Sequence, residues 1–403
     1  MMRFSVALLM LGSLACGDAV PRKRALSVPS PKPVTTMPPE FAPLGEAEPV
    51  REAEPPAVQS PPASSNTPIG DAGASDSGKA AARTYRAAPE IALAGKNGDS
   101  VDLVLQEADS AYNDARYQDA EALYQKARRG APKRAAPIVG VARSRIRKLG
   151  FAMELASAKN NSSVRVQVNE LRLAIKTEPD FGPAHVELGR ALLLLDDVPK
   201  ALTSLERGAE LLPREAEAQS AYGVALLASG KAKEAIVALT RARELDPETP
   251  QRHGNLGTAL MLVGRTREAV SQYEEQARIL DGDARAHSDL GTALLAAGEL
   301  ERGSKELERA VELDPNRASI RSNLGYALQL RGKTKEAIQM YREAIRLDEK
   351  AVSAWINLGA LLGRDVTTRG EGKKALERAR ALDPSDPRVL ANLNELEMLE
   401  KKK

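Results

Sequence analysis

Between residues 182 and 362, small and apolar residues recur at a fixed interval of 34 positions. One position in every interval is glycine, with an apolar residue directly before it and a leucine three residues after it. The glycines are Gly189, Gly223, Gly257, Gly291, Gly325 and Gly359. Residues spaced i, i+1 and i+4 share one face of an α-helix. Each interval is therefore expected to contain a helix that packs along this face.

A second set of positions predicts a turn and a second helix in each interval. Gly230, Gly264, Gly298 and Gly332, again 34 residues apart, mark the turn. Large residues then recur in the second helix at Tyr124, Leu205, Leu239, Tyr273, Leu307 and Tyr341. Proline ends several of these helices because it cannot continue one. The sequence predicts tandem helical hairpins in which a large side chain fills the space beside a glycine or alanine.

The hairpins are expected to form an all-α array over residues 101–386, in about eight units. We place the unit starts at Val101, Ala135, Gly182, Ala216, Pro250, Ala284, Ala318 and Val352. The unit over residues 135–181 is longer than the others, and we expect its first helix to extend through residues 151–158, with a turn at 160–163. A capping helix is expected over residues 387–403, with Pro387 in its first turn. A lone hairpin exposes an apolar face, so stacked neighbours are needed to bury it.

The N-terminal residues show none of this periodicity. Residues 1–15, MMRFSVALLMLGSLA, carry a positive charge, a short apolar stretch and small residues before a cleavage point, which is typical of an export signal. Residues 13–16 resemble the lipobox of bacterial lipoproteins, although Ser13 replaces the usual leucine. This resemblance implies that Cys16, the single cysteine, is lipidated. The alternative is ordinary cleavage after Ala15, which leaves a free thiol.

Residues 16–98 are rich in proline and alanine and include the pairs Pro38-Pro39, Pro55-Pro56 and Pro61-Pro62. Such a segment buries too little apolar surface to offset the entropy of ordering it. We expect a disordered linker, with at most a short helix over residues 79–94 that is interrupted at Pro89.

Composition narrows the classes of function. The net charge is +3 and aromatic residues make up 3% of the chain. A nucleic-acid-binding domain is usually more basic, so no nucleic-acid partner is expected. The sequence has no GxSxG, HExxH or P-loop pattern. We therefore expect no enzymatic activity and no small-molecule cofactor.

The repeated positions resemble the tetratricopeptide repeat. Trp355-Ile356-Asn357-Leu358-Gly359, followed by Leu362, is similar to the first-helix pattern of that family, and Ala337, Tyr341 and Ala344 match its second-helix pattern. The resemblance implies a right-handed α-solenoid. It also implies a concave groove, lined by the first helices, that binds protein or peptide partners.

Four residues lie two positions before the glycines and are candidates for peptide binding: Asn255, Asp289, Asn323 and Asn357. An amide side chain both donates and accepts hydrogen bonds, and the family uses such asparagines to hold the backbone of a peptide. The alternative is that this position favours asparagine for contacts between helices. Ser288, Thr292, Ser322 and Tyr326 are expected to line the groove beside these residues.

The three histidines, His185, His253 and His287, all lie four residues before a glycine. A metal site would need more imidazoles around one ion than neighbouring helices can supply. We expect these histidines to replace the packing residue that Trp355 represents, and we expect no metal.

These observations favour a scaffold that is tethered to the bacterial cell envelope and binds protein partners, for example in assembling a pilus, secretion or cell-wall complex. A lipid anchor would place it on the outer membrane, facing the periplasm. The alternatives are a soluble periplasmic or secreted carrier of peptides and, less favoured, a regulatory subunit of an envelope enzyme.

Overall fold

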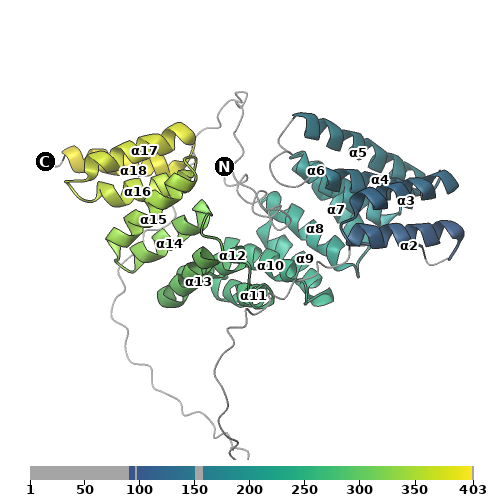
Figure 1. The fold of residues 1–403 in the computed structure, drawn as a ribbon, viewed down its shortest axis with the longest axis horizontal. Coiled ribbons are helices and arrows are strands. Elements are labelled where there is room, and N and C mark those ends of the chain that lie inside the picture. The colour runs from purple at the N-terminus through teal and green to yellow at the C-terminus, as the bar shows by residue number, and fades with distance from the viewer. Residues whose placement is uncertain (1–89, 96–97, 150–157, 402–403) are drawn as a thin grey trace, which may run out of the picture. The chain divides into compact units, whose positions relative to one another are not determined.

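The computed structural model describes residues 90–95, 98–149 and 158–401. The predicted export signal, Cys16 and the linker up to residue 89 lie outside the described residues. All described residues belong to the same one of the two units into which the chain divides. Within the described ranges, every regular element is an α-helix (Figure 1). The prediction of an all-α fold is confirmed.

The helices form consecutive antiparallel pairs, followed by one final helix. The pairs are α2 (Ser100–Asn113) with α3 (Tyr117–Gly130), α4 (Ala135–Lys148) with α5 (Ala158–Thr177), α6 (Gly182–Leu194) with α7 (Val198–Leu211), α8 (Ala216–Ala228) with α9 (Ala232–Leu245), α10 (Pro250–Leu262) with α11 (Thr266–Ile279), α12 (Ala284–Ala296) with α13 (Leu300–Leu313), α14 (Ala318–Leu330) with α15 (Thr334–Leu347), and α16 (Val352–Gly363) with α17 (Arg369–Leu382). The final helix is α18 (Pro387–Lys401).

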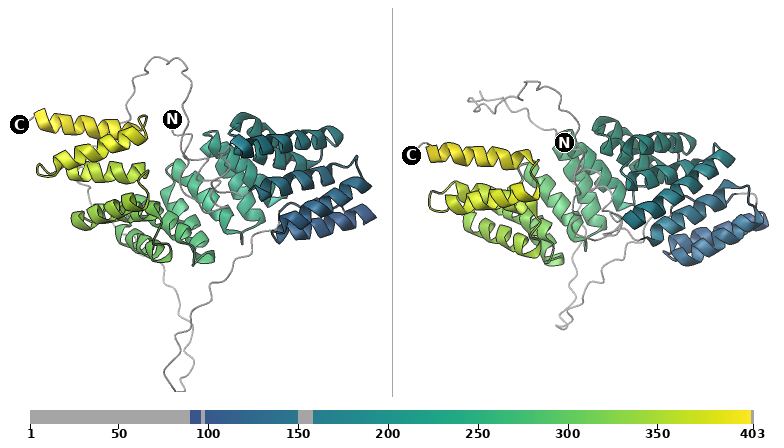
Figure 2. Two further views of the ribbon diagram at one scale, coloured as in Figure 1. Left: turned by 45° about the horizontal axis from the view of Figure 1, so that its top comes forward. Right: turned by 90° about the horizontal axis from the view of Figure 1, so that it is seen from above.

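Each helix packs against the next one along the chain, so the pairs stack in sequence order (Figure 2). The first helices of neighbouring pairs also contact one another, as α4 contacts α6 and α12 contacts α14. Within the described part of the chain, second helices make no comparable contacts with one another. The first helices α2, α4, α6, α8, α10, α12, α14 and α16 therefore share one face of the stack, which we call the first-helix face.

Local sequence fixes where several helices begin. The Asp283 side chain accepts hydrogen bonds from the backbone N–H groups of Arg285 and Ala286 at 2.9 and 2.8 Å, which satisfies two donors at the start of α12. Asp99 accepts in the same way from Asp102 at the start of α2. Pro250 begins α10, at a position where a backbone N–H would have no acceptor within the helix, so proline loses no hydrogen bond there.

Small residues let the two helices of each pair approach closely, as predicted. A Cβ atom added at Gly291 would lie 2.7 Å from Cγ of Leu307, and one added at Gly325 would lie 2.7 Å from Cε1 of Tyr341. Leu307 and Tyr341 are fully buried. The large side chain of the second helix thus occupies the space above the glycine of the first helix.

The turns within the pairs adopt a left-handed backbone conformation. Gly230, Gly264, Gly298 and Gly332 have φ between +76° and +84°. Ala115 and Asp196 adopt the same conformation, with φ of 59° and 60°, at the corresponding turns of α2–α3 and α6–α7. A Cβ atom makes this conformation unfavourable, so the turns at Ala115 and Asp196 are strained, whereas the turns that carry glycine are not.

The turn predicted at residues 160–163 is wrong, because these residues lie within α5. Val164, Val168, Leu171 and Ala174 are buried at intervals of three or four residues, and this packing extends the helix toward its N-terminus. Asparagine and serine are common in turns, but they are also tolerated in the first turn of a helix. The expected extension of the first helix lies outside the described residues, except Ala158, which begins α5.

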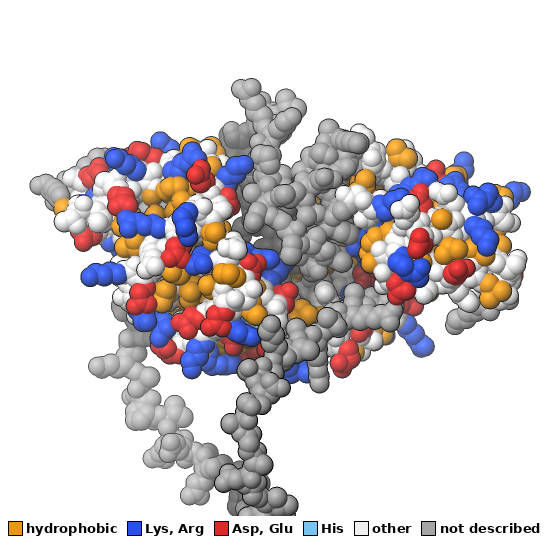
Figure 3. All heavy atoms as spheres, viewed as in Figure 1, with side chains coloured by type: hydrophobic (Ala, Val, Ile, Leu, Met, Phe, Trp, Pro, Cys, Tyr) orange, Lys and Arg blue, Asp and Glu red, His pale blue; other side chains and the backbone are white. Residues whose placement is uncertain are grey.

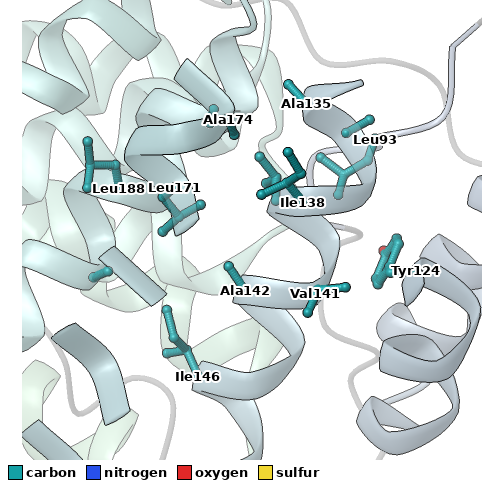
Figure 4. Close-up of a cluster of buried hydrophobic side chains, with 14 of the residues drawn as sticks. Leu93, Tyr124, Ala135, Ile138, Val141, Ala142, Ile146, Leu171, Ala174 and Leu188 are labelled. Atoms are coloured by element: carbon teal, nitrogen blue, oxygen red, sulfur yellow. The ribbon is translucent and has the colours of Figure 1, made fainter. Parts of the chain in front are cut away.

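Residues 90–95 differ from the expected linker and from the expected short helix. They are not helical, and Ile91 and Leu93 are only 6% and 3% exposed. Figure 4 shows Leu93 beside Ile138 of α4, within the cluster of buried side chains. This short segment therefore packs against the array.

A search of the described helices found none with the length and apolar character required to cross a lipid bilayer.

Candidate protein-binding face

Asn255 and Asn323 link neighbouring first helices. The Asn255 amide donates a hydrogen bond to Oγ of Ser220 in α8 at 3.3 Å, and the Asn323 amide donates to Oγ of Ser288 in α12 at 3.2 Å. Both asparagines are half-buried. Each hydrogen bond uses one amide hydrogen, so the same side chains retain a second donor and a carbonyl acceptor for a ligand. The structure thus supports the helix-contact interpretation and leaves the peptide-binding prediction open.

Asp289 has a different environment from the asparagines. The residue that corresponds to Ser220 and Ser288 is Gly254 in α10, so no hydroxyl faces Asp289 from that position. Burial among the first helices raises the pKa of Asp289 to about 6, and Arg285, 3.8 Å away, only partly opposes this rise. Asn357, in α16, is half-buried.

Tyr326 and Thr292 are exposed on the first-helix face, and Tyr326 is 44% exposed. Each is the ninth residue of its helix, α14 or α12. Leu262 and Leu330, the thirteenth residues of α10 and α14, are also exposed, which is unusual for large apolar side chains. Figure 3 shows hydrophobic side chains between charged ones over the C-terminal helices. These exposed residues provide apolar contact surface beside the asparagines.

Ser288 and Ser322 lie deeper than the sequence suggested, because both are buried. The backbone carbonyl of Ser288 accepts a hydrogen bond from the Thr292 hydroxyl at 2.8 Å, and its own hydroxyl accepts from Asn323. Ser288 thus positions Thr292 and Asn323, and those two side chains lie nearer the surface.

The histidines and Trp355 make the same contact, as predicted from their shared position. Nε2 of His253 lies 2.8 Å from the carbonyl oxygen of Pro247, and Nε1 of Trp355 donates to the carbonyl of Glu349 at 3.0 Å. His185 and His287 pair with the carbonyls of Pro179 and Asp281 in the same way. In every case the acceptor lies six residues earlier, so this ring ties the first helix to the end of the preceding hairpin. The described residues hold no group of three or more potential metal ligands.

A buried cluster of charges lies on the first-helix face of the N-terminal units, and the sequence analysis missed it. Arg143 of α4 is buried, pairs with Asp109 of α2 at 2.6 Å and also donates to the Tyr124 hydroxyl. Arg190 of α6 pairs with Glu187 at 3.1 Å and with Glu217 of α8. Arg143 and Arg190 occupy the helix position that α10, α12 and α14 fill with threonine or tyrosine, and this difference was the available signal.

The fold and these contacts define an α-solenoid of tandem helical hairpins. Residues 282–350 match the family model for the tetratricopeptide repeat, and residues 173–284 match the model for the bacterial transcriptional activator domain. Residues 282–350 therefore match the repeat that the sequence resembles, and the hairpins on either side of them pack in the same consecutive manner. Arrays of this kind generally act as non-enzymatic scaffolds for protein partners.

Solved structures with a similar fold include the APC/C hetero-tetramer Cut9-Hcn1 and the human IFIT1 dimer with PPP-AAAA. The first has a TM-score of 0.54 and 17% identity, over 74% of this chain and 56% of that chain. The second has a TM-score of 0.50 and 18% identity, over 75% of this chain and 73% of that chain. This protein thus spans little more than half of the Cut9-Hcn1 chain that it matches. No curated protein matches the sequence. At these identities the likeness establishes the fold alone.

Proposed function

We propose that this protein is a non-enzymatic scaffold of the bacterial cell envelope that binds an extended segment of a partner protein along the first-helix face of α10, α12, α14 and α16. The observation that carries the proposal is the exposure of Tyr326, Leu262 and Leu330 beside the half-buried Asn255 and Asn323 amides. Exposed apolar side chains next to fixed polar groups are typical of recognition surfaces.

The binding face is tested by affinity capture from envelope extract with the full chain and an Asn323→Ala plus Asn357→Ala variant. The double variant is expected to lose the captured partner, because it removes two amides from the face. Asn169→Ala is the matched control, since Asn169 is exposed on the second helix α5. Equal capture by the double variant and the control would move the interface away from this face.

The proposed location rests on the N-terminal sequence. An export signal followed by Cys16 supports a lipid anchor in the outer membrane, facing the periplasm. Two or more acyl chains would hold the protein stably on a bilayer. Labelling cells with a fatty-acid precursor should mark the wild-type protein and leave Cys16→Ser unmarked. An unlabelled wild-type protein would favour a soluble periplasmic or secreted peptide carrier.

A further inference from the structure

Residues 90–95 contact the first helices α2, α4 and α6 without forming a helix of their own. The backbone N–H groups of Leu93 and Ala94 donate to Oδ2 of Asp109 at 2.8 and 3.0 Å. The carbonyl of Ile91 accepts from Nη1 of Arg143 at 2.8 Å, and the N–H of Glu90 donates to Asn113 at 3.0 Å. Side chains of the array thus satisfy polar groups of this backbone, and one carboxylate oxygen of Asp109 accepts from two successive N–H groups.

Two apolar side chains of this segment, Ile91 and Leu93, are buried against the array. Ile91 packs in a cluster with Val186 of α6 and Ala218 of α8, and Leu93 packs in a cluster with Ile138 of α4. Ala92, between them, is exposed. The array therefore has two apolar sites for residues that are two positions apart.

The Glu90 carboxylate fits a basic site between α4 and α6. It pairs with Arg190 at 2.7 Å and with Arg147. Burial opposes ionisation of Glu90, but Arg190 and Arg147 outweigh it and lower the pKa to about 2. The alternation of charges continues along the first helices, because Arg190 also pairs with Glu217, which pairs with Arg252 at 2.7 Å.

The arginines that hold this segment occupy helix positions that are exposed in α12 and α14. Arg143 and Arg190 are the ninth residues of α4 and α6, the position of Tyr326 in α14. Arg147 is the thirteenth residue of α4, the position of Leu330 in α14. Residues 90–95 therefore cover, in the N-terminal units, the face that is open in the C-terminal units.

We infer that the first-helix face of α2, α4 and α6 is a peptide-binding site whose ligand in this structure is the chain's own segment 90–95. The site selects a peptide with a carboxylate side chain and with apolar residues one and three positions after it, the pattern Glu-Ile-Ala-Leu. A partner peptide with this pattern competes with the segment. The inference rests on the proposed function, since it assigns a ligand chemistry to another part of the same face.

The short connection to α2 explains why the segment stays bound. Four residues separate Gly95 from Ser100, where α2 begins. A short tether gives an effective concentration on the order of millimolar. A free peptide must exceed this concentration, or bind more tightly, in order to displace the segment.

The site is tested with a fluorescein-labelled peptide of the sequence APEIALAGKN, which copies residues 88–97. The full-length variant Ile91→Asp plus Leu93→Asp is expected to release its own segment, because both carboxylates would enter apolar sites. This variant should bind the peptide at least about tenfold more tightly than the wild-type chain does, because only the wild type has a tethered competitor. A peptide with glutamine in place of the Glu90 equivalent should bind at least about threefold more weakly, since it lacks the charge.

Fluorescence anisotropy measures the binding, and circular dichroism confirms that the variant is helical. A folded variant that binds no peptide up to about 1 mM would overturn the inference, because that concentration matches the tether. Equal binding of the glutamate and glutamine peptides would overturn the assigned ligand chemistry.

Hydrogen exchange on the wild-type chain decides the question if the variant does not fold. The amides of Leu93 and Ala94 should exchange faster in the presence of excess unlabelled peptide, while the amides of α12 should be unchanged. If the exchange rates of residues 90–95 were the same with and without the peptide, the segment would be a permanent part of the fold and the inference would be overturned. The peptide and exchange experiments use a synthetic peptide and report on α2 to α6. The capture experiment uses a cellular partner and reports on α14 and α16, so a negative result in one does not imply a negative result in the other.

Discussion

Replacing Gly372 in α17 with alanine is expected to destabilise the last hairpin, although alanine is the better helix former. A Cβ atom at Gly372 would lie 2.6 Å from the backbone nitrogen of Gly363 and 2.7 Å from the carbonyl oxygen of Gly359, both in α16. Backbone atoms cannot rotate away, so the two helices must separate. Overpacking of this kind costs about 1–3 kcal/mol, and the gain in helix propensity offsets at most about 1 kcal/mol. We expect a net loss of about 1 kcal/mol.

Gly370→Ala provides the matched control in the same helix. A Cβ atom at Gly370 would meet no atom within 4 Å, so this variant should be neutral or slightly more stable. Urea denaturation followed by far-UV circular dichroism compares the two midpoints with that of wild type. Repeat arrays often unfold unit by unit, so hydrogen exchange in α16 and α17 should confirm where stability is lost. If Gly372→Ala proved as stable as Gly370→Ala, close glycine contacts would not hold the hairpins together.

Three further predictions concern single positions. Asp289→Asn should raise the free energy of unfolding at pH 7 by about 1 kcal/mol, a value reduced for the 31% exposure of the side chain. Because folding raises the pKa of Asp289 to about 6, the wild-type protein loses stability as the pH rises toward and through 6. Thermal melts should therefore show the stability difference between variant and wild type vanishing below about pH 4. Arg143→Ala should cost about 3 kcal/mol because it leaves the buried Asp109 carboxylate without its cation. Arg207→Ala, on the exposed face of α7, should leave the urea midpoint close to that of wild type in the same denaturation assay. Ala115→Gly should stabilise the α2–α3 turn by up to about 1 kcal/mol, and an unchanged melting temperature would show that the turn is unstrained.

The hairpins were predictable because their main contacts are local and repeated. Gly291 meets Leu307, and Gly325 meets Tyr341, each across 16 residues of sequence. Every unit repeats this pairing, so the periodic positions carry the same information several times. The start of α5 was not predictable in the same way, because its unit departs from the 34-residue interval.

The binding face was only partly predictable, since its chemistry depends on contacts between units. The position of Asn323 followed from the repeat, but its hydrogen bond to Ser288 depends on a residue 35 positions earlier. The pairing of Glu90 with Arg190 spans 100 residues, and six residues are too few to show a period. Charges that are buried by distant segments leave little trace in local sequence.

Site-specific photocrosslinking tests the central claim, that partners bind on the first-helix face. A photoreactive phenylalanine analogue is placed at Tyr326, which is 44% exposed on α14, or at Val237, which is 73% exposed on the second helix α9. Irradiation of whole cells should yield a discrete adduct with a partner protein from position 326 and none from position 237. Adducts from position 237 alone, or equal adducts from both positions, would contradict the account.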